Sequence, residues 1–380
     1  MDTQQSCDVA IIGGGVIGCS IAYQLRKAGV DALIVERQEV AAEASSAAAG
    51  LLAPFGSLTE PGPFSDLVLA SWSLAPTLLP QIEQESGVQV EYRRVGALHI
   101  AANDREVEAL RQQMKSWEAL GAKMTWLTED ETREREPLLG VQTNVPIQAA
   151  ILIEGEGSIK APAVARAYAE AARRAGTRFA LATEVVGIMR SGSRVVGIKT
   201  ARGETISCQR LVIAGGAWSA SCGEWLGLTI PVVPMKGQIL SLGQPKPALR
   251  HIIFSEEVYF VPKLDGTIFI GATVEQAGFD KRLTAGGISW LLNSAMRLIP
   301  ALEQATIVQM WAGLRPWSRD SHPVLGQAPG WENVILATGH SAMGFELSAI
   351  TGKMIAELIT SGQTPELIRP FGIERFLEQA

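Results

Sequence analysis

The sequence predicts an α/β fold in which a Rossmann-like domain, assembled from separated segments, holds an inserted α+β domain with a mixed sheet. Three observations support this prediction. The chain opens with an apolar run, a group of glycines, a helical pattern and a second apolar run. β-rich segments then gather between residues 232 and 272, and a helical pattern returns near the C-terminal side. At 380 residues, the chain is also long enough for two domains.

The opening segment is predicted to form a βαβ unit. Residues 9–12 are apolar without alternation, which is typical of a parallel strand covered on both faces. Apolar residues at helical spacing follow between residues 18 and 28, and Gly29 provides a stop. Residues 32–35 are a second apolar strand.

Helices and strands are mixed along the rest of the chain. A helical pattern covers residues 64–86, but Pro76 and Pro80 predict a kink or break there, because each proline costs about 3 kcal/mol inside a helix. The other predicted helices cover residues 103–120, 162–175, 288–299 and 344–359. The other predicted strands cover residues 88–100, 147–153, 211–214, 232–242, 258–262 and 267–272.

Composition and charge argue against several classes of protein. The net charge is −6 and no Lys/Arg block stands out, so nucleic acid is not expected as a partner. The four cysteines are scattered and the four histidines form no close pair, so we predict no metal site and no disulfide framework, as suits the cytoplasm. The first residues carry no positive charge, unlike a secretory signal. No apolar run approaches the roughly 18 residues that a membrane span needs.

The glycines after the first strand match the GxGxxG pattern of dinucleotide-binding proteins. Gly13 would make the turn, Gly15 would let the backbone approach a pyrophosphate, and Gly18 would allow close helix packing. Glu36 ends the second strand, where an acidic residue accepts hydrogen bonds from a ribose and disfavours a 2′-phosphate. This pattern leaves both NAD and FAD open as cofactors, and a chance glycine turn is the remaining alternative.

Residues 37–51 and several later motifs favour FAD. The later motifs lie at residues 214–219, 259–262, 271–274, 311–316 and 338–340. With these motifs, nearly the whole chain resembles the D-amino-acid oxidase superfamily of flavoproteins, and most of all its glycine oxidase branch, which is associated with thiamine biosynthesis. The resemblance implies an FAD-binding domain formed by residues 1–84, 151–225 and 310–380. It implies a substrate-binding domain formed by residues 85–150 and 226–309. No cysteine lies near Arg315, where some relatives attach flavin covalently, so non-covalent FAD is expected.

The resemblance also implies which residues contact the cofactor. The implied contacts are Gly13, Gly15, Val16, Ile17, Gly18, Glu36, Arg37, Ala44, Ser45, Ser46, Ala49, Gly50, Leu51, Val185, Gly339, His340, Ser341, Met343, Gly344 and Phe345. A simple helix cap is the alternative role for Ser45 and Ser46, and a core strand position is the alternative for Val185. The positive end of the final helix would stabilise negative charge on reduced flavin.

Arg315 and Tyr259 are the candidate catalytic residues. The planar guanidinium of Arg315 suits bidentate binding of a substrate carboxylate, and the resemblance favours this role over an internal salt bridge. Tyr259 would add a hydroxyl group to the same carboxylate, although a strand tyrosine is more often half-buried packing.

Three further residues are assigned to the substrate pocket, namely Leu51, Glu257 and Ala342. Ala342 stands where glycine oxidases place a second arginine in a GHxRNG loop, so the carboxylate clamp is incomplete. Glu257 precedes Tyr259 by two residues, and strand alternation would turn it to the same face as an acid in the pocket. A rim carboxylate in water is the alternative for Glu257.

The resemblance implies flavin-dependent oxidative deamination of a small amino acid or amine, such as glycine, sarcosine or a small D-amino acid. A hydride would pass from the substrate Cα to FAD, and oxygen would reoxidise the cofactor, giving hydrogen peroxide, an oxoacid and ammonia. One alternative is a dehydrogenase that passes electrons to a quinone or partner subunit. Another is a flavin-binding subunit without turnover. The sequence leaves the oligomeric state open, with a homo-oligomer as one option.

Overall fold

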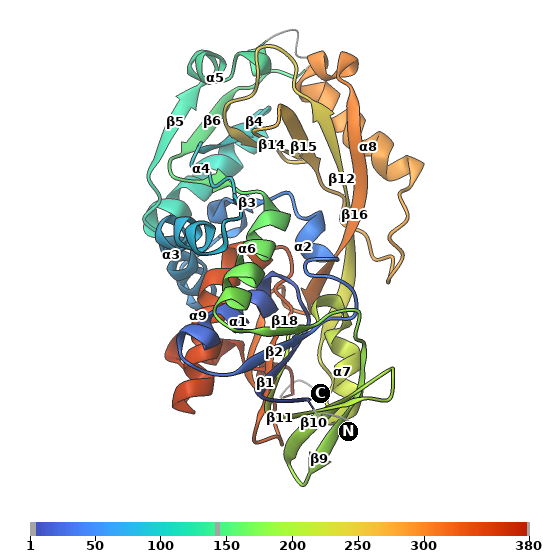
Figure 1. Cartoon of the computed structure of the whole chain (residues 1–380). Helices are drawn as coiled ribbons and strands as arrows, with labels where there is room; N and C mark the ends of the chain where they lie inside the picture. Colours follow the sequence, from blue (N-terminus) through green and yellow to red (C-terminus); the bar gives the residue numbers. More distant parts are fainter. Residues whose placement is uncertain (1–4, 141–144, 378–380) are drawn as a thin grey trace.

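The computed structural model describes residues 5–140 and 145–377, which form two eight-stranded sheets one above the other (Figure 1). The first sheet has the strand order β17-β18-β11-β1-β2-β8, and β10 and β9 extend from β11. Its strands are β1 (Gln5–Ile12), β2 (Ala32–Val35), β8 (Arg178–Ala180), β9 (Val185–Ser191), β10 (Arg194–Thr200), β11 (Thr205–Ile213), β17 (Val324–Gln327) and β18 (Val334–Thr338). β8, β2, β1, β11 and β18 pair in parallel, as the βαβ prediction requires.

Helices cover one face of the first sheet. They are α1 (Val16–Lys27), α3 (Pro63–Ser86), α6 (Ala161–Arg174) and α9 (Gly344–Ser361), and they pack on one another through one hydrophobic cluster that includes Val9 and Ile11 of β1. Ala10 on the other face of β1 joins a cluster with β10 and with α7 (Ser219–Leu226). The central strands are therefore buried on both faces, which explains their unbroken apolar sequences.

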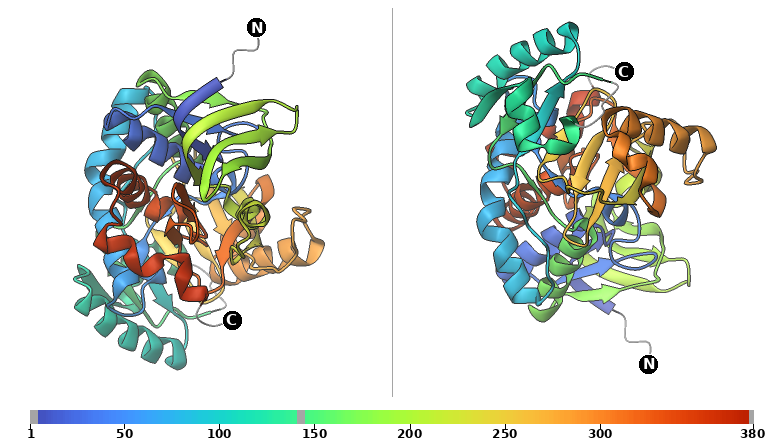
Figure 2. Two further views of the ribbon diagram at one scale, coloured as in Figure 1. Left: turned by 90° about the horizontal axis from the view of Figure 1, so that it is seen from below. Right: turned by 90° about the horizontal axis from the view of Figure 1, so that it is seen from above.

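The second sheet has the order β16-β12-β15-β14-β13-β4-β6-β5. Its strands are β4 (Ala97–Ala101), β5 (Met124–Thr128), β6 (Ala149–Ile153), β12 (Val232–Gly243), β13 (Ile252–Phe254), β14 (Tyr259–Pro262), β15 (Thr267–Gly271) and β16 (Ile307–Ser318). Most pairs are antiparallel, but β4 and β13 are parallel, so this sheet is mixed as predicted. Seen from above, α8 (Ala285–Leu298) and the segment of α4 (Asp104–Ala119) and α5 (Glu129–Arg135) lie on opposite flanks (Figure 2).

The structure contains no break at Pro76 and Pro80, and it differs from the predicted strand at 88–100. α3 continues through Pro76 and Pro80 as one helix of 24 residues, because one face of it is buried against α6 and α9 and this tertiary contact outweighs the local cost of the prolines. The predicted strand at 88–100 shrinks to β4, and within residues 88–96 only an isolated bridge from Arg93 to Ser158 has strand geometry. In the residues described, no helix has both the length and the apolar character needed to cross a membrane.

Candidate active site

The glycine turn joins β1 to α1 under tight steric limits. Gly13 has φ of +109°, and a Cβ atom there would overlap the carbonyl of Ala214 at the end of β11. A Cβ atom at Gly18 would overlap the carbonyl of Gly13. At Gly15 the nearest neighbour would be the Ser45 hydroxyl at 3.3 Å, and Gly15 borders a cavity. The protein itself therefore requires the first and third glycines, while the second leaves its backbone open to a ligand.

Glu36 follows β2 and lies beside this turn. Its carboxylate accepts hydrogen bonds from the backbone amides of Gly14 at 2.7 Å and Gln38 at 2.9 Å. The amide of Thr183 donates to the Glu36 carbonyl at 2.9 Å, which brings the start of β9, and so Val185, to the same end of the sheet. Val185 packs against the hydrophobic cluster on that face of the sheet.

The short helix α2 (Ala44–Ala47) is tied to the start of α1. The hydroxyl of Ser45 accepts a hydrogen bond from the amide of Val16 at 3.0 Å, while Ser46 donates to the carbonyl of Glu43. Arg37 pairs with Glu43 at 2.8 Å and stacks on the Trp218 ring at 3.7 Å. The charge of Arg37 is therefore balanced within the protein, and the first turn of α1 is positioned by Ser45.

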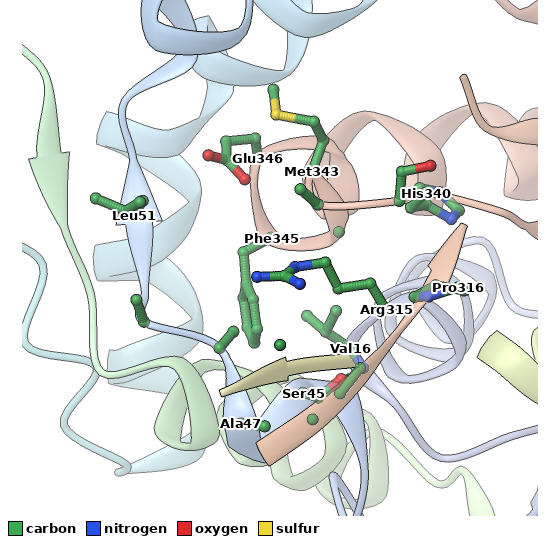
Figure 3. A pocket seen from close by; sticks show the side chains of 18 of the residues that line it. Val16, Ser45, Ala47, Leu51, Arg315, Pro316, His340, Met343, Phe345 and Glu346 are labelled. Carbon is green, nitrogen blue, oxygen red and sulfur yellow. The ribbon is translucent and has the colours of Figure 1, made fainter. Parts of the chain in front are cut away.

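A cavity of about 310 Å³ opens where this turn meets the second sheet (Figure 3). Four of the residues assigned to the substrate contribute to its lining, namely Leu51, Tyr259, Arg315 and Ala342. The predicted cofactor residues along it are Gly15, Val16, Ile17, Ala44, Ser45, Ala49, Gly50, Leu51, His340, Ser341, Met343, Gly344 and Phe345. The structure places the other predicted cofactor residues outside this lining, namely Gly13, Gly18, Glu36, Arg37, Ser46, Val185 and Gly339.

Arg315 lies on β16 and points into this cavity (Figure 3). Its Nη1 donates to the carbonyl of Thr273 at 3.1 Å and to that of Lys236 at 3.5 Å. A Cβ atom at Gly237 on the neighbouring strand would overlap the guanidinium, so the glycine provides the space that the side chain occupies. Within residues 5–140 and 145–377, no carboxylate forms an ion pair with Arg315. The guanidinium thus keeps hydrogen-bonding capacity for an anionic ligand.

Tyr259 is the first residue of β14 and borders the same cavity. A Cβ atom at Gly271 on β15 would overlap its hydroxyl group, so a second glycine makes room for a polar side chain. Burial raises the pKa of Tyr259 to about 12, and the charge of Arg315 opposes this rise. The hydroxyl therefore stays protonated near neutral pH and can donate a hydrogen bond.

The loop before α9 supplies the far wall of the cavity. His340 is buried, its Nε2 lies 3.1 Å from the Thr351 hydroxyl, and burial lowers its pKa to about 3, so the ring is neutral. Ser341 adopts a positive φ of 50°. Ala342 is exposed and borders the cavity without adding charge, which leaves Arg315 without a second arginine at this position.

Glu257 does not line this cavity, and the interpretation of it as a pocket acid is wrong. β14 begins at Tyr259, so Glu257 belongs to the turn before the strand and the alternation of strand side chains does not apply to it. Its carboxylate forms an ion pair with Arg297 of α8 at 3.0 Å. The acid that does line the cavity is Glu346, in the first turn of α9.

Sequence reasoning missed Glu346 and also Phe254, an aromatic residue on β13 that borders the cavity. The available signal for Glu346 was that no other charged residue occurs between Gly344 and Gly352. The apolar periodicity predicted the helix at 344–359, but it gave no indication that Glu346 faces a cavity.

A strand, a glycine turn and a helix N-terminus that open onto a cavity with an unpaired arginine are typical of a protein that binds a dinucleotide cofactor and an anionic ligand. Residues 8–358 match the family model described as "DAO: FAD dependent oxidoreductase". The chain belongs to this family, and FAD is its cofactor.

Individual relatives agree with this family. The chain is 35% identical to glycine oxidase from Geobacillus kaustophilus over 371 residues, which cover 97% of each chain. The crystal structure of glycine oxidase from that organism superposes with a TM-score of 0.92 at 34% identity, over 97% of this chain and 98% of that one. Hydrogen cyanide synthase subunit HcnC from Pseudomonas aeruginosa is 30% identical, over 97% of this chain and 96% of its own.

Proposed function

We propose that this protein is an oxidase that deaminates a small amino acid or amine. The observation that carries the proposal is the unpaired guanidinium of Arg315, which faces the same cavity as the glycine turn. An amino-acid carboxylate would complete the hydrogen bonds of this guanidinium, because its planar fork matches a carboxylate. The similarity to glycine oxidases supports an amine substrate.

The residues around the glycine turn fit the adenine-ribose and pyrophosphate parts of FAD. The backbone at Gly15 is open to the cavity, and Glu36 lies at the end of β2 where a ribose would be bound. When bound, FAD supplies the hydride acceptor of the reaction, and oxygen is its proposed oxidant. We propose non-covalent attachment, since the cavity lining contains no cysteine among the described residues.

The second sheet would hold the substrate, in keeping with the proposed division into an FAD-binding and a substrate-binding domain. Arg315 would bind the carboxylate, and the neutral hydroxyl of Tyr259 would donate to it. This arrangement fixes the substrate Cα for hydride loss. The imine that results is hydrolysed by water to an oxoacid and ammonia. The free cysteines, all buried, suit a cytoplasmic location.

An anaerobic screen of flavin bleaching tests the proposal. Purified protein would be mixed with glycine, sarcosine, N-ethylglycine, D-proline and an amine without a carboxylate, and the flavin absorbance would be followed. We expect bleaching by at least one carboxylate-bearing member. The proposal fails if the purified protein contains FAD but none of these compounds reduces it.

A dehydrogenase that passes electrons to a quinone or partner subunit is the second candidate. The observation that favours it is the similarity to HcnC, which is named as a subunit of a synthase. Stopped-flow mixing of the reduced protein with oxygen separates the two candidates. Reoxidation as fast as turnover identifies an oxidase, and slow reoxidation that a quinone accelerates identifies a dehydrogenase.

A further inference from the structure

Glu346 is an acidic side chain inside the candidate active site to which the proposed function assigns no task. It lies in the first turn of α9 and lines the same cavity as Arg315 and Tyr259. Figure 3 shows its carboxylate projecting from the start of the helix between Met343 and Leu51. It is partly exposed, and it faces the cavity that it lines.

The protein provides no cation for this acid. Its carboxylate takes part in no ion pair in the described part of the chain. Arg315 in the same cavity has no carboxylate partner either, and the two side chains do not pair with each other. The cavity therefore holds one carboxyl group without a cationic partner and one guanidinium without an anionic partner. A zwitterionic amino acid is complementary to this pair, since it carries one charge of each sign.

The surroundings of Glu346 favour its neutral form. Burial is the main cause that raises its pKa to about 8, and the nearby carboxylate of Glu156 adds to this rise. Glu156 itself lies 3.7 Å from the Nε2 of His99. The titratable groups near Glu346 are Glu156 on the segment after β6 and Tyr259 on β14, and Arg315 on β16 and His340 on the loop before α9 line the same cavity.

We propose that Glu346 binds the ammonium group of a substrate whose carboxylate lies on Arg315, and that it accepts one proton from this ammonium. The inference rests on the proposed function. An N–H bond of the ammonium breaks, an O–H bond forms on Glu346, and the substrate is left with the neutral amine that hydride loss from Cα requires. A pKa of about 8 is much closer to the pKa of a substrate ammonium than the pKa of an ordinary carboxyl group is. The proton transfer therefore has a small free-energy change. The substrate class is then a monocarboxylic amino acid with a basic amine, and a second carboxylate would be repelled.

The test is the pH dependence of flavin reduction in stopped-flow experiments at low substrate concentration. The substrate is whichever of glycine, sarcosine, N-ethylglycine and D-proline reduces the flavin fastest. The wild type should show an acidic limb near pH 8, below which the rate falls as Glu346 becomes protonated. Glu346→Gln should lack this acidic limb, and its rate of flavin reduction should increase with pH until the substrate amine itself deprotonates. At the pH optimum of the wild type, the variant should reduce flavin at least about tenfold more slowly. The matched control is Glu357→Gln, which removes the same charge from the exposed side of α9 and should behave as wild type.

A second measurement separates proton transfer from a structural role. A substrate with a weakly basic amine, N-(2,2,2-trifluoroethyl)glycine, is already neutral near pH 8, so it should lose much less of its rate in Glu346→Gln than N-ethylglycine does. An unchanged pH profile in Glu346→Gln, or an equal loss for both substrates, overturns the inference. If Glu346→Gln does not bind FAD, Glu346→Asp decides, because a displaced limb supports the inference and an unmoved limb overturns it. Absence of bleaching by every amine in the wild type would instead refute the proposed function.

Discussion

Replacement of Arg315 by methionine is the most direct test of the substrate clamp. Methionine keeps an unbranched stem in the cavity and removes the charge. In the structure, Nη1 is engaged by the carbonyls of Thr273 and Lys236, while the guanidinium has no anionic partner among the described residues. We therefore expect the substrate carboxylate to gain at least one charge-assisted hydrogen bond from this side chain.

The magnitude follows from that single bond. A hydrogen bond to a charged group contributes about 1.5 to 3 kcal/mol, which corresponds to roughly a ten- to hundred-fold loss of kcat/KM in Arg315→Met. Arg315→Lys should recover only part of this loss, because an ammonium cannot reproduce the planar fork. Amine oxidation would be followed by flavin bleaching and by turnover, with the FAD content measured for each variant.

Arg319 provides the matched control, because it is an exposed arginine just beyond the end of β16. Arg319→Met should retain wild-type kcat/KM. The reasoning is refuted if Arg315→Met binds FAD and keeps its kcat/KM within about threefold of the wild type. An equal loss for an amine without a carboxylate would also refute it, since that substrate makes no bond to the guanidinium.

Further predictions follow from the same geometry. Gly237→Ala should displace the Arg315 guanidinium and lower kcat/KM, while FAD stays bound. Gly187→Ala is the control and should keep the wild-type kcat/KM, because a Cβ atom there has no neighbour within 4 Å. Equal kinetics in the two variants would contradict this expectation. Gly15→Val should yield colourless protein, because the valine side chain would block the approach of the backbone to the pyrophosphate. The flavin absorbance of the purified variant measures this loss. Ala342→Arg should shift kcat/KM from bulkier amines towards glycine, and a wild type that already prefers glycine would disprove this expectation. His340, neutral when folded with a pKa of about 3, should make unfolding easier as the pH falls from 6.5 towards 3, by up to about 1.4 kcal/mol per pH unit. Thermal unfolding against pH, with His340→Gln as the comparison, would detect this slope, since the unfolded chain binds the proton that the folded chain excludes.

The first βαβ unit was predictable because its signals are local. Apolar runs without alternation, glycines at fixed spacing and Glu36 after the second strand all lie within one short segment, and the structure confirms both strands and the helix. The continuity of α3 was not predictable from local signals. The prolines argue for a break, but contacts with α6 and α9, which come much later in the chain, stabilise the helix.

The acid of the cavity was missed for a similar reason. An acidic residue in the first turn of a helix ordinarily faces water near the positive end of the helix dipole. That Glu346 instead faces the cavity depends on how α9 is placed against β3 (Leu51–Leu52), which is distant in sequence. Glu257 failed as a candidate because the alternation of strand side chains was extended to a residue that precedes the predicted strand at 258–262, and β14 begins only at Tyr259.

The strand order has a consequence for synthesis of the chain on the ribosome. β1 lies between β2, which follows it directly, and β11, which is translated only after β4, β5 and β6 of the other sheet. α9, which is translated later still, then closes over α1, where Gly352 meets Ser20 so closely that a Cβ atom would overlap the serine. Until β11 emerges, the nascent polypeptide presents a bare apolar strand edge, which is a template for pairing with other chains. The speed of elongation between β2 and β11 therefore sets how long the nascent protein is exposed to aggregation.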